Sequence, residues 1–186
     1  TNDNNATVGV YSIAYVFASM INIFAMAILQ YIFPRIYTML SSGNIDYVQI
    51  RKFFFGFAAI MTVALVGMIV ATPVLYHFFI NEKYHPALQY CWLLCGGCYL
   101  WAITYFLYAY LLFYKKKRTI FILSIAGIIV SVTLNYLLIP KWKDMGAAWS
   151  TFLSYLLVLI ITLFFTGEFW KKFLVKPTAI PPESEQ

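Results

Sequence analysis

The chain has 186 residues, of which 62% are hydrophobic, 20% are aromatic and only 11% are charged. Soluble globular domains usually carry about 25% charged residues, so this composition excludes an ordinary soluble domain. The formal net charge is +6, but the basic residues stand in short blocks between apolar runs. Such blocks are typical of membrane topology signals and not of a nucleic-acid-binding face, so we predict an all-α, polytopic membrane protein that binds no nucleic acid.

The first predicted span is residues 8–33, which follow a polar lead-in at residues 1–7. The lead-in has no signal-peptide pattern and begins with Thr1, so we expect the chain to be a piece of a longer protein. The span carries no charge and exceeds the ~20 residues needed to cross a hydrocarbon core. Pro34 is predicted to close its helix.

A polar stripe follows one side of this first span. At about 100° per residue its members fall within one arc of the helix, and they include Tyr15, Ser19, Asn22 and Gln30. Polar groups in lipid need hydrogen-bond partners or water, so the stripe faces either a neighbouring helix or an aqueous cavity. Both alternatives stay open, and for a transporter the length of the stripe favours a substrate pathway.

Residues 53–72 form the second predicted span. Pro73 follows it directly and predicts a kink or a short surface helix. His77 and His85 lie beyond this proline. Histidines in such a place are usually polar surface residues, and we prefer that interpretation to a proton relay or a ligand site.

The third predicted span, residues 87–114, contains all three cysteines of the chain. Cys91, Cys95 and Cys98 share one helical face. A zinc site needs thiolates that converge on the ion from different directions, which a single apolar helix does not supply. We therefore interpret the three cysteines as small packing residues.

Residues 119–139 form the fourth predicted span, directly after the basic block of residues 115–118. We interpret this block as an orientation signal and not as a phosphate-binding patch. Ser131 and Asn135 share one face of the span. That polar face makes them further candidates for the lining of a substrate pathway.

The fifth predicted span is residues 146–166, and only residues 141–145 separate it from the fourth. So short a connection predicts a helical hairpin with a tight polar turn at the membrane surface. Gly146, Ser150 and Ser154 recur at every fourth position of the second helix. Such an edge of small residues lets another helix approach closely, so we predict a helix-packing role for all three.

The distribution of basic residues predicts the orientation of the chain. Only Lys83, Lys141 and Lys143 fall on one side of the predicted spans. By the positive-inside rule, the opposite side is cytoplasmic, so the N-terminal end lies outside and the tail, residues 167–186, is a disordered cytoplasmic segment. That cytoplasmic side carries the other ten basic residues: Arg35, Arg51, Lys52, Lys115, Lys116, Lys117, Arg118, Lys171, Lys172 and Lys176.

Sequence motifs of enzymes do not occur in this chain. It has no Walker motif, dinucleotide-binding glycine pattern, His-Glu-x-x-His or nucleophile elbow, and no Asp, Glu, Lys or Arg lies within a predicted span. Enzymes that act on lipid diphosphates need acids, bases or metal ligands beside the phosphate. We therefore expect a non-enzyme with no catalytic residue, metal site or cofactor. A membrane-embedded glycosyltransferase or polymerase subunit is a weaker alternative, and a structural membrane subunit is the third.

Three stretches resemble a known family. Residues 135–140 read Asn-x-x-Leu-Ile-Pro, and residues 146–155 read Gly-Ala-Ala-x-Ser-Thr-x-x-Ser-Tyr. Together they resemble the penultimate-to-last helix signature of bacterial polysaccharide flippases, whose superfamily also holds multidrug/toxin exporters and lipid II flippases. Residues 8–14, Val-Gly-Val-Tyr-Ser-Ile-Ala, are similar to the opening of the eighth helix in that family. Many relatives carry a glycine three residues after the proline, where this chain has Lys143.

The resemblance implies a transporter that flips undecaprenyl-diphosphate-linked oligosaccharides, such as O-antigen units of lipopolysaccharide, across the bacterial inner (plasma) membrane by alternating access. In that family two six-helix lobes rock against each other, and this chain would supply five helices of the second lobe. Its partners would be the lipid-linked oligosaccharide, membrane lipids and the N-terminal helices of the same protein. A multidrug exporter of the same superfamily is an alternative. In either case we expect the pathway to be lined by Tyr15, Ser19, Asn22, Gln30, Ser131 and Asn135.

Overall fold

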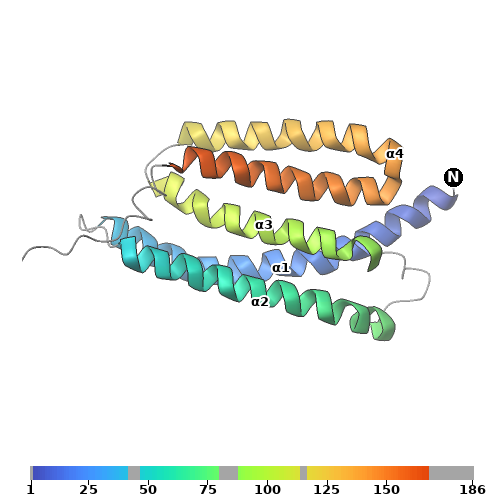
Figure 1. The fold of residues 1–186 in the computed structure, drawn as a ribbon, viewed down its shortest axis with the longest axis horizontal. Coiled ribbons are helices and arrows are strands. Elements are labelled where there is room, and N and C mark those ends of the chain that lie inside the picture. Colours follow the sequence, from blue (N-terminus) through green and yellow to red (C-terminus); the bar gives the residue numbers. More distant parts are fainter. Residues whose placement is uncertain (1, 42–46, 80–87, 114–116, 168–186) are drawn as a thin grey trace, which may run out of the picture.

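The chain folds into long antiparallel helices (Figure 1). The structure, a computed structural model, describes residues 2–41, 47–79, 88–113 and 117–167. Within these parts of the chain there is no strand, and each helix is long and apolar enough to cross a membrane. The all-α class and the membrane-spanning character are therefore as predicted. The helices are α1 (Asn2–Ser41), α2 (Tyr47–Phe79), α3 (Leu88–Phe113) and α4 (Lys117–Phe165).

The number of helices differs from the five that were predicted, because the fourth and fifth spans both lie within α4. This helix folds back on itself into two antiparallel arms (Figure 1). Only Lys143, with φ 48 and ψ −122, leaves helical geometry. The turn is so tight that helical structure resumes directly after it. We call residues 117–142 the first arm and residues 144–165 the second arm.

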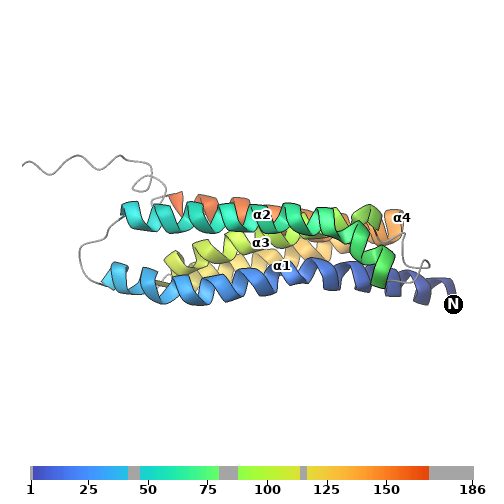
Figure 2. The ribbon, with the colours of Figure 1, turned by 90° about the horizontal axis from the view of Figure 1, so that it is seen from below.

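Three prolines lie inside helices instead of ending them: Pro34 in α1, Pro73 in α2 and Pro140 in α4. The prediction that Pro34 closes the first helix is wrong, since α1 continues to Ser41. Membrane helices tolerate an interior proline because neighbouring groups satisfy the freed carbonyl. Helix α2 likewise continues through Pro73 to Phe79 and bends toward that end (Figure 2), so of the two predicted alternatives the kink is seen and a separate surface helix is not. The lead-in of the sequence also belongs to α1, which begins at Asn2.

Helix α3 occupies the centre of the bundle, with α4 on one side and the pair α1 and α2 on the other (Figures 1 and 2). Its predicted packing face is confirmed, because Cys91, Cys95 and Cys98 are all buried. Helix α1 packs against α3 with a face of small residues that was not predicted from the sequence. This face includes the fully buried Ala14 and Ala18. Small side chains on both helices let the backbones approach closely where lipid gives no hydrophobic drive for association.

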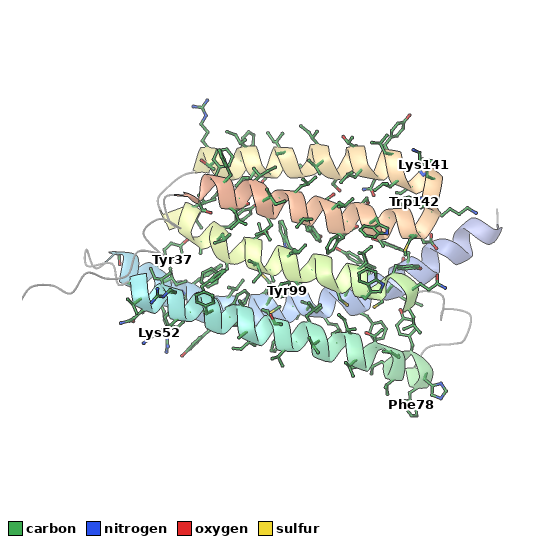
Figure 3. All side chains as sticks on the ribbon, viewed as in Figure 1. Tyr37, Lys52, Phe78, Tyr99, Lys141 and Trp142 are labelled. Carbon is green, nitrogen blue, oxygen red and sulfur yellow. The ribbon has the colours of Figure 1, made fainter. Side chains whose placement is uncertain are left out.

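The two ends of the bundle carry different side chains (Figure 3). Tyr37 and Lys52 lie at one end, whereas Phe78, Lys141 and Trp142 lie at the other. The first end is also where α1 finishes, α2 begins and α4 begins, so it holds three more of the described basic residues, Arg35, Arg51 and Arg118. We call it the basic end. Of the residues used for the orientation, six lie outside the described parts of the chain: Lys83, Lys115, Lys116, Lys171, Lys172 and Lys176.

Candidate functional site

A cavity of about 440 Å³ lies between α3 and the two arms of α4, with Tyr15 of α1 at its margin. Trp101 stands near the middle of α3, and Gly127 and Tyr155 stand near the middles of the first and second arms. The cavity therefore lies at mid-depth of the bundle. We call it the central cavity. It is lined by Tyr15, Trp101, Tyr108, Leu123, Ser124, Gly127, Ile128, Ser131, Val132, Thr151, Ser154, Tyr155 and Val158.

Aromatic rings form one wall of the central cavity. The ring of Trp101 lies 5.3 Å from that of Tyr155, with an angle of 32° between the planes. Tyr108 meets the same indole edge-on at 6.2 Å. At the α1 margin, Tyr15 stacks on Tyr11 at 6.2 Å. Offset and edge-to-face pairs of this kind hold the rings in fixed orientations, so the wall is preorganised for a flat ligand.

Hydroxyl groups supply the polar part of the lining. Ser124 donates to the carbonyl of Ile120 at 3.0 Å, and Ser154 donates to the carbonyl of Ser150 at 2.6 Å. Thr151 donates to the carbonyl of Ala147 at 3.0 Å. A hydroxyl that donates to its own helix still has lone pairs that accept hydrogen bonds. These oxygens can therefore receive hydrogen bonds from a hydroxyl-rich ligand, while the tyrosine phenols can donate or accept.

Charged groups do not line the central cavity, since none of its thirteen described lining residues is Asp, Glu, Lys, Arg or His. In the described residues there is also no group of three or more His, Cys, Asp or Glu that could hold a metal ion. The lining therefore presents hydroxyl groups and aromatic rings, with no carboxylate, imidazole or cationic side chain among its described residues. What it can do is bind a neutral molecule through stacking and hydrogen bonds.

Two of the six predicted pathway residues, Tyr15 and Ser131, line the central cavity, although they come from α1 and α4. The other residues of the α1 stripe lie elsewhere. Ser19 donates to the carbonyl of its own helix at Val16, at 2.7 Å, and Gln30 is exposed on the outside of the bundle. Asn22 donates from Nδ2 to the sulfur of Cys98 on α3 at 3.4 Å. The residues of the stripe thus lie in different environments and do not form one continuous lining.

Asn135 points toward the second arm of α4, where its Oδ1 accepts a hydrogen bond from Ser150. The three predicted packing residues lie on the inner side of this hairpin and are all buried. A Cβ on Gly146 would lie 2.3 Å from the carbonyl oxygen of Leu138, so only glycine fits beside the first arm there. Ser154 is buried within the hairpin and also lines the central cavity.

Several cavity residues were not identified from the sequence, above all Trp101 and Tyr108 on α3. They stand seven residues apart and so share a helical face. That spacing could have indicated a shared aromatic face, but this helix was interpreted as a packing helix because of its three cysteines. Tyr155 and Thr151 belong to the family-like stretch in the second arm, and their place beside Trp101 depends on how the arm packs on α3.

Comparisons with protein-family models, with curated proteins and with solved structures gave no match.

Proposed function

We propose that the chain is part of a transporter that carries an undecaprenyl-diphosphate-linked oligosaccharide across the bacterial inner membrane for polysaccharide synthesis. The observation that carries this proposal is the neutral, aromatic and hydroxyl-lined cavity at mid-depth of a membrane bundle. The resemblance of residues 135–140 and 146–155 to polysaccharide flippases supports it. Under this proposal the basic end faces the cytoplasm.

Saccharides match the lining in two ways. The C–H groups of a sugar ring carry a small positive charge, and the face of an aromatic ring carries a negative one, so a sugar can stack on Trp101 or Tyr155. Sugar hydroxyls both donate and accept hydrogen bonds, as the phenols and the serine and threonine oxygens of the cavity do. Because no lining charge needs to be neutralised, the neutral saccharide part of the substrate can enter without leaving an ionic group unpaired, whereas the charged diphosphate would stay outside this cavity.

The arrangement of helices suits movement of the hairpin relative to α1 and α2. Both stand against α3, but on opposite sides of it (Figure 1). The central cavity lies on the α4 side of α3, with Tyr15 reaching it from α1. A shift of α4 along α3 would therefore open or close the cavity while α3 keeps its contacts with α1. In the proposed cycle the saccharide occupies the cavity and the lipid tail stays in the bilayer.

A multidrug exporter is the second candidate, because the same aromatic wall would accept a flat, apolar drug. The two candidates differ in what they require of the hydroxyl groups. A sugar needs hydrogen bonds from Tyr155 as well as its ring, whereas a drug needs only the ring. Tyr155→Phe keeps the ring and removes the hydroxyl, so it should lower glycan export and leave drug resistance unchanged.

The proposed function is tested by replacing Trp101 with Leu in the complete protein and measuring surface polysaccharide in cells that lack the native copy. We expect export to fall about tenfold, the value of one lost aromatic interaction, with membrane abundance unchanged. Trp92→Leu is the matched control, since Trp92 lies on the same helix but is half exposed and outside the cavity. Normal export by a Trp101→Leu and Tyr155→Leu double variant would remove the cavity from the transport pathway.

A further inference from the structure

The basic end of the bundle combines four cations with no described acidic partner. Arg35, Arg51, Lys52 and Arg118 come from the ends of three different helices. Among the acidic residues, only Asp144 has a described side chain, and it lies in the hairpin turn at the opposite end of the bundle.

Each of these helices also presents an aromatic ring one turn closer to the membrane centre than its cation. Tyr31 is 59% exposed and lies four residues before Arg35, whose Cζ is 4.2 Å from the ring centroid. Phe55 is 58% exposed and lies four residues after Arg51. Phe121 is 66% exposed and lies three residues after Arg118. The same order, cation outside and exposed ring inside, is thus repeated on three helices.

The cations of α1 and α2 stand at the same end of the bundle, near the end of α1 and the beginning of α2. Their neighbours in sequence, Ile36 and Ile50, are both buried in the same hydrophobic core. The two helices are in contact and run antiparallel, so the end of α1 and the beginning of α2 lie at the same end of the bundle, although Figure 2 shows their ribbons apart there. The guanidinium of Arg35 is held over Tyr31 and does not extend freely, which lowers the entropy lost when it binds a ligand.

We infer that the α1–α2 side of the basic end binds the headgroup of an anionic phospholipid. Guanidinium groups bind phosphate oxygens in pairs, and lysine adds a point charge beside them. The rings of Tyr31 and Phe55 lie where the glycerol and the first methylenes of the lipid begin, so they contact the apolar part of the same molecule. A free phosphate ion would use the cations but leave these rings uncovered. This inference does not depend on the transported substrate.

The inference can be tested by native mass spectrometry of the complete protein in detergent with added phosphatidylglycerol or phosphatidylcholine. We expect retained adducts with phosphatidylglycerol only. Arg35→Gln with Lys52→Gln should weaken that binding roughly thirtyfold, since each basic residue near a membrane surface contributes about fivefold. Lys141→Gln with Lys143→Gln removes the same charge at the opposite end and should leave the binding unchanged.

Further variants and a competition measurement distinguish lipid binding from other causes. Arg35→Lys with Lys52→Arg keeps both charges and should retain most of the affinity. If the neutral double variant fails to fold, Lys52→Gln alone should still weaken binding about fivefold. Inorganic phosphate at the same concentration should not compete, because it gains nothing from the rings. Equal binding of both lipids, equal loss in both neutral double variants, or full competition by inorganic phosphate would each overturn the inference.

Discussion

The side-chain amide of Asn22 on α1 donates a hydrogen bond to the sulfur of Cys98 on α3, across 3.4 Å. Its Oδ1 is buried and has no partner among the described residues. The amide therefore joins two helices through a weak acceptor and leaves one polar atom unpaired. This gives Asn22 a packing contact at a position where the sequence had suggested a pathway residue.

We expect Asn22→Leu to lower stability by at most about 0.6 kcal/mol, the average for polar contacts between membrane helices. The loss is small because the substitution also removes the unpaired Oδ1. Thermal unfolding in detergent measures the change, and Cys98→Ala supplies the partner variant for a double-mutant cycle. Glycan export should remain normal. Loss of export at normal membrane abundance would instead return Asn22 to the substrate pathway.

Gly146→Ala should destabilise the hairpin by about 1–3 kcal/mol, the usual cost of overpacking. The added methyl would meet the backbone of Leu138, and a backbone group cannot turn aside as a side chain can. Gly56→Ala is the control, because nothing lies within 4 Å of a Cβ at that position. The melting temperature in detergent should fall for the first variant and hold or rise for the second. Equal melting temperatures would mean that the arms of α4 stand further apart.

Lys143→Gly should stabilise the protein by about 1 kcal/mol. Lys143 has φ 48, a conformation that costs a residue with a side chain about 1–3 kcal/mol and costs glycine little. The gain is reduced by the greater freedom of glycine in the unfolded chain. Lys143→Ala removes the same charge without relieving the backbone, so it should not stabilise. Lys141→Gly, at a helical position, should destabilise by about 1 kcal/mol. A Lys143→Gly variant no more stable than Lys143→Ala would contradict the strained backbone conformation at position 143.

The orientation is tested by accessibility labelling of single cysteines in a background without Cys91, Cys95 and Cys98. Lys52→Cys and Lys141→Cys stand at opposite ends of the bundle (Figure 3). Because the basic end is predicted to be cytoplasmic, an impermeant thiol reagent added to intact cells should modify only the cysteine at position 141. Labelling at position 52 alone would reverse the proposed orientation.

Sequence periodicity predicted the helices well where charged or polar residues bounded an apolar run. The third span was predicted as residues 87–114 and is observed as Leu88–Phe113. The predicted turn at residues 141–145 likewise contains the only described break in helical geometry inside α4. Pro34 was misjudged because its effect on the helix depends on neighbouring groups that sequence does not reveal.

The central cavity was only partly predictable, because it is made by three helices. Tyr15 and Ser131 could be selected as polar residues in apolar spans. Trp101 looked like an ordinary aromatic residue of a membrane helix, and its importance comes from Tyr155, which lies on another helix. Asn135 was predicted as a pathway residue, but its side chain accepts a hydrogen bond from Ser150 within the hairpin. Periodicity identifies a polar face, but tertiary packing decides what that face meets.

The central position of α3 has a consequence for biogenesis. Of the four described spans, α3 is the most enclosed and the least apolar. An isolated span enters the bilayer by virtue of its own apolar residues, so α3 has the weakest tendency to leave the translocon for lipid by itself. We expect α1 and α2 to remain beside the translocon until α3 emerges and packs against them. The hairpin of α4 then encloses its remaining side, which makes cotranslational insertion of this chain a stepwise assembly instead of four independent events.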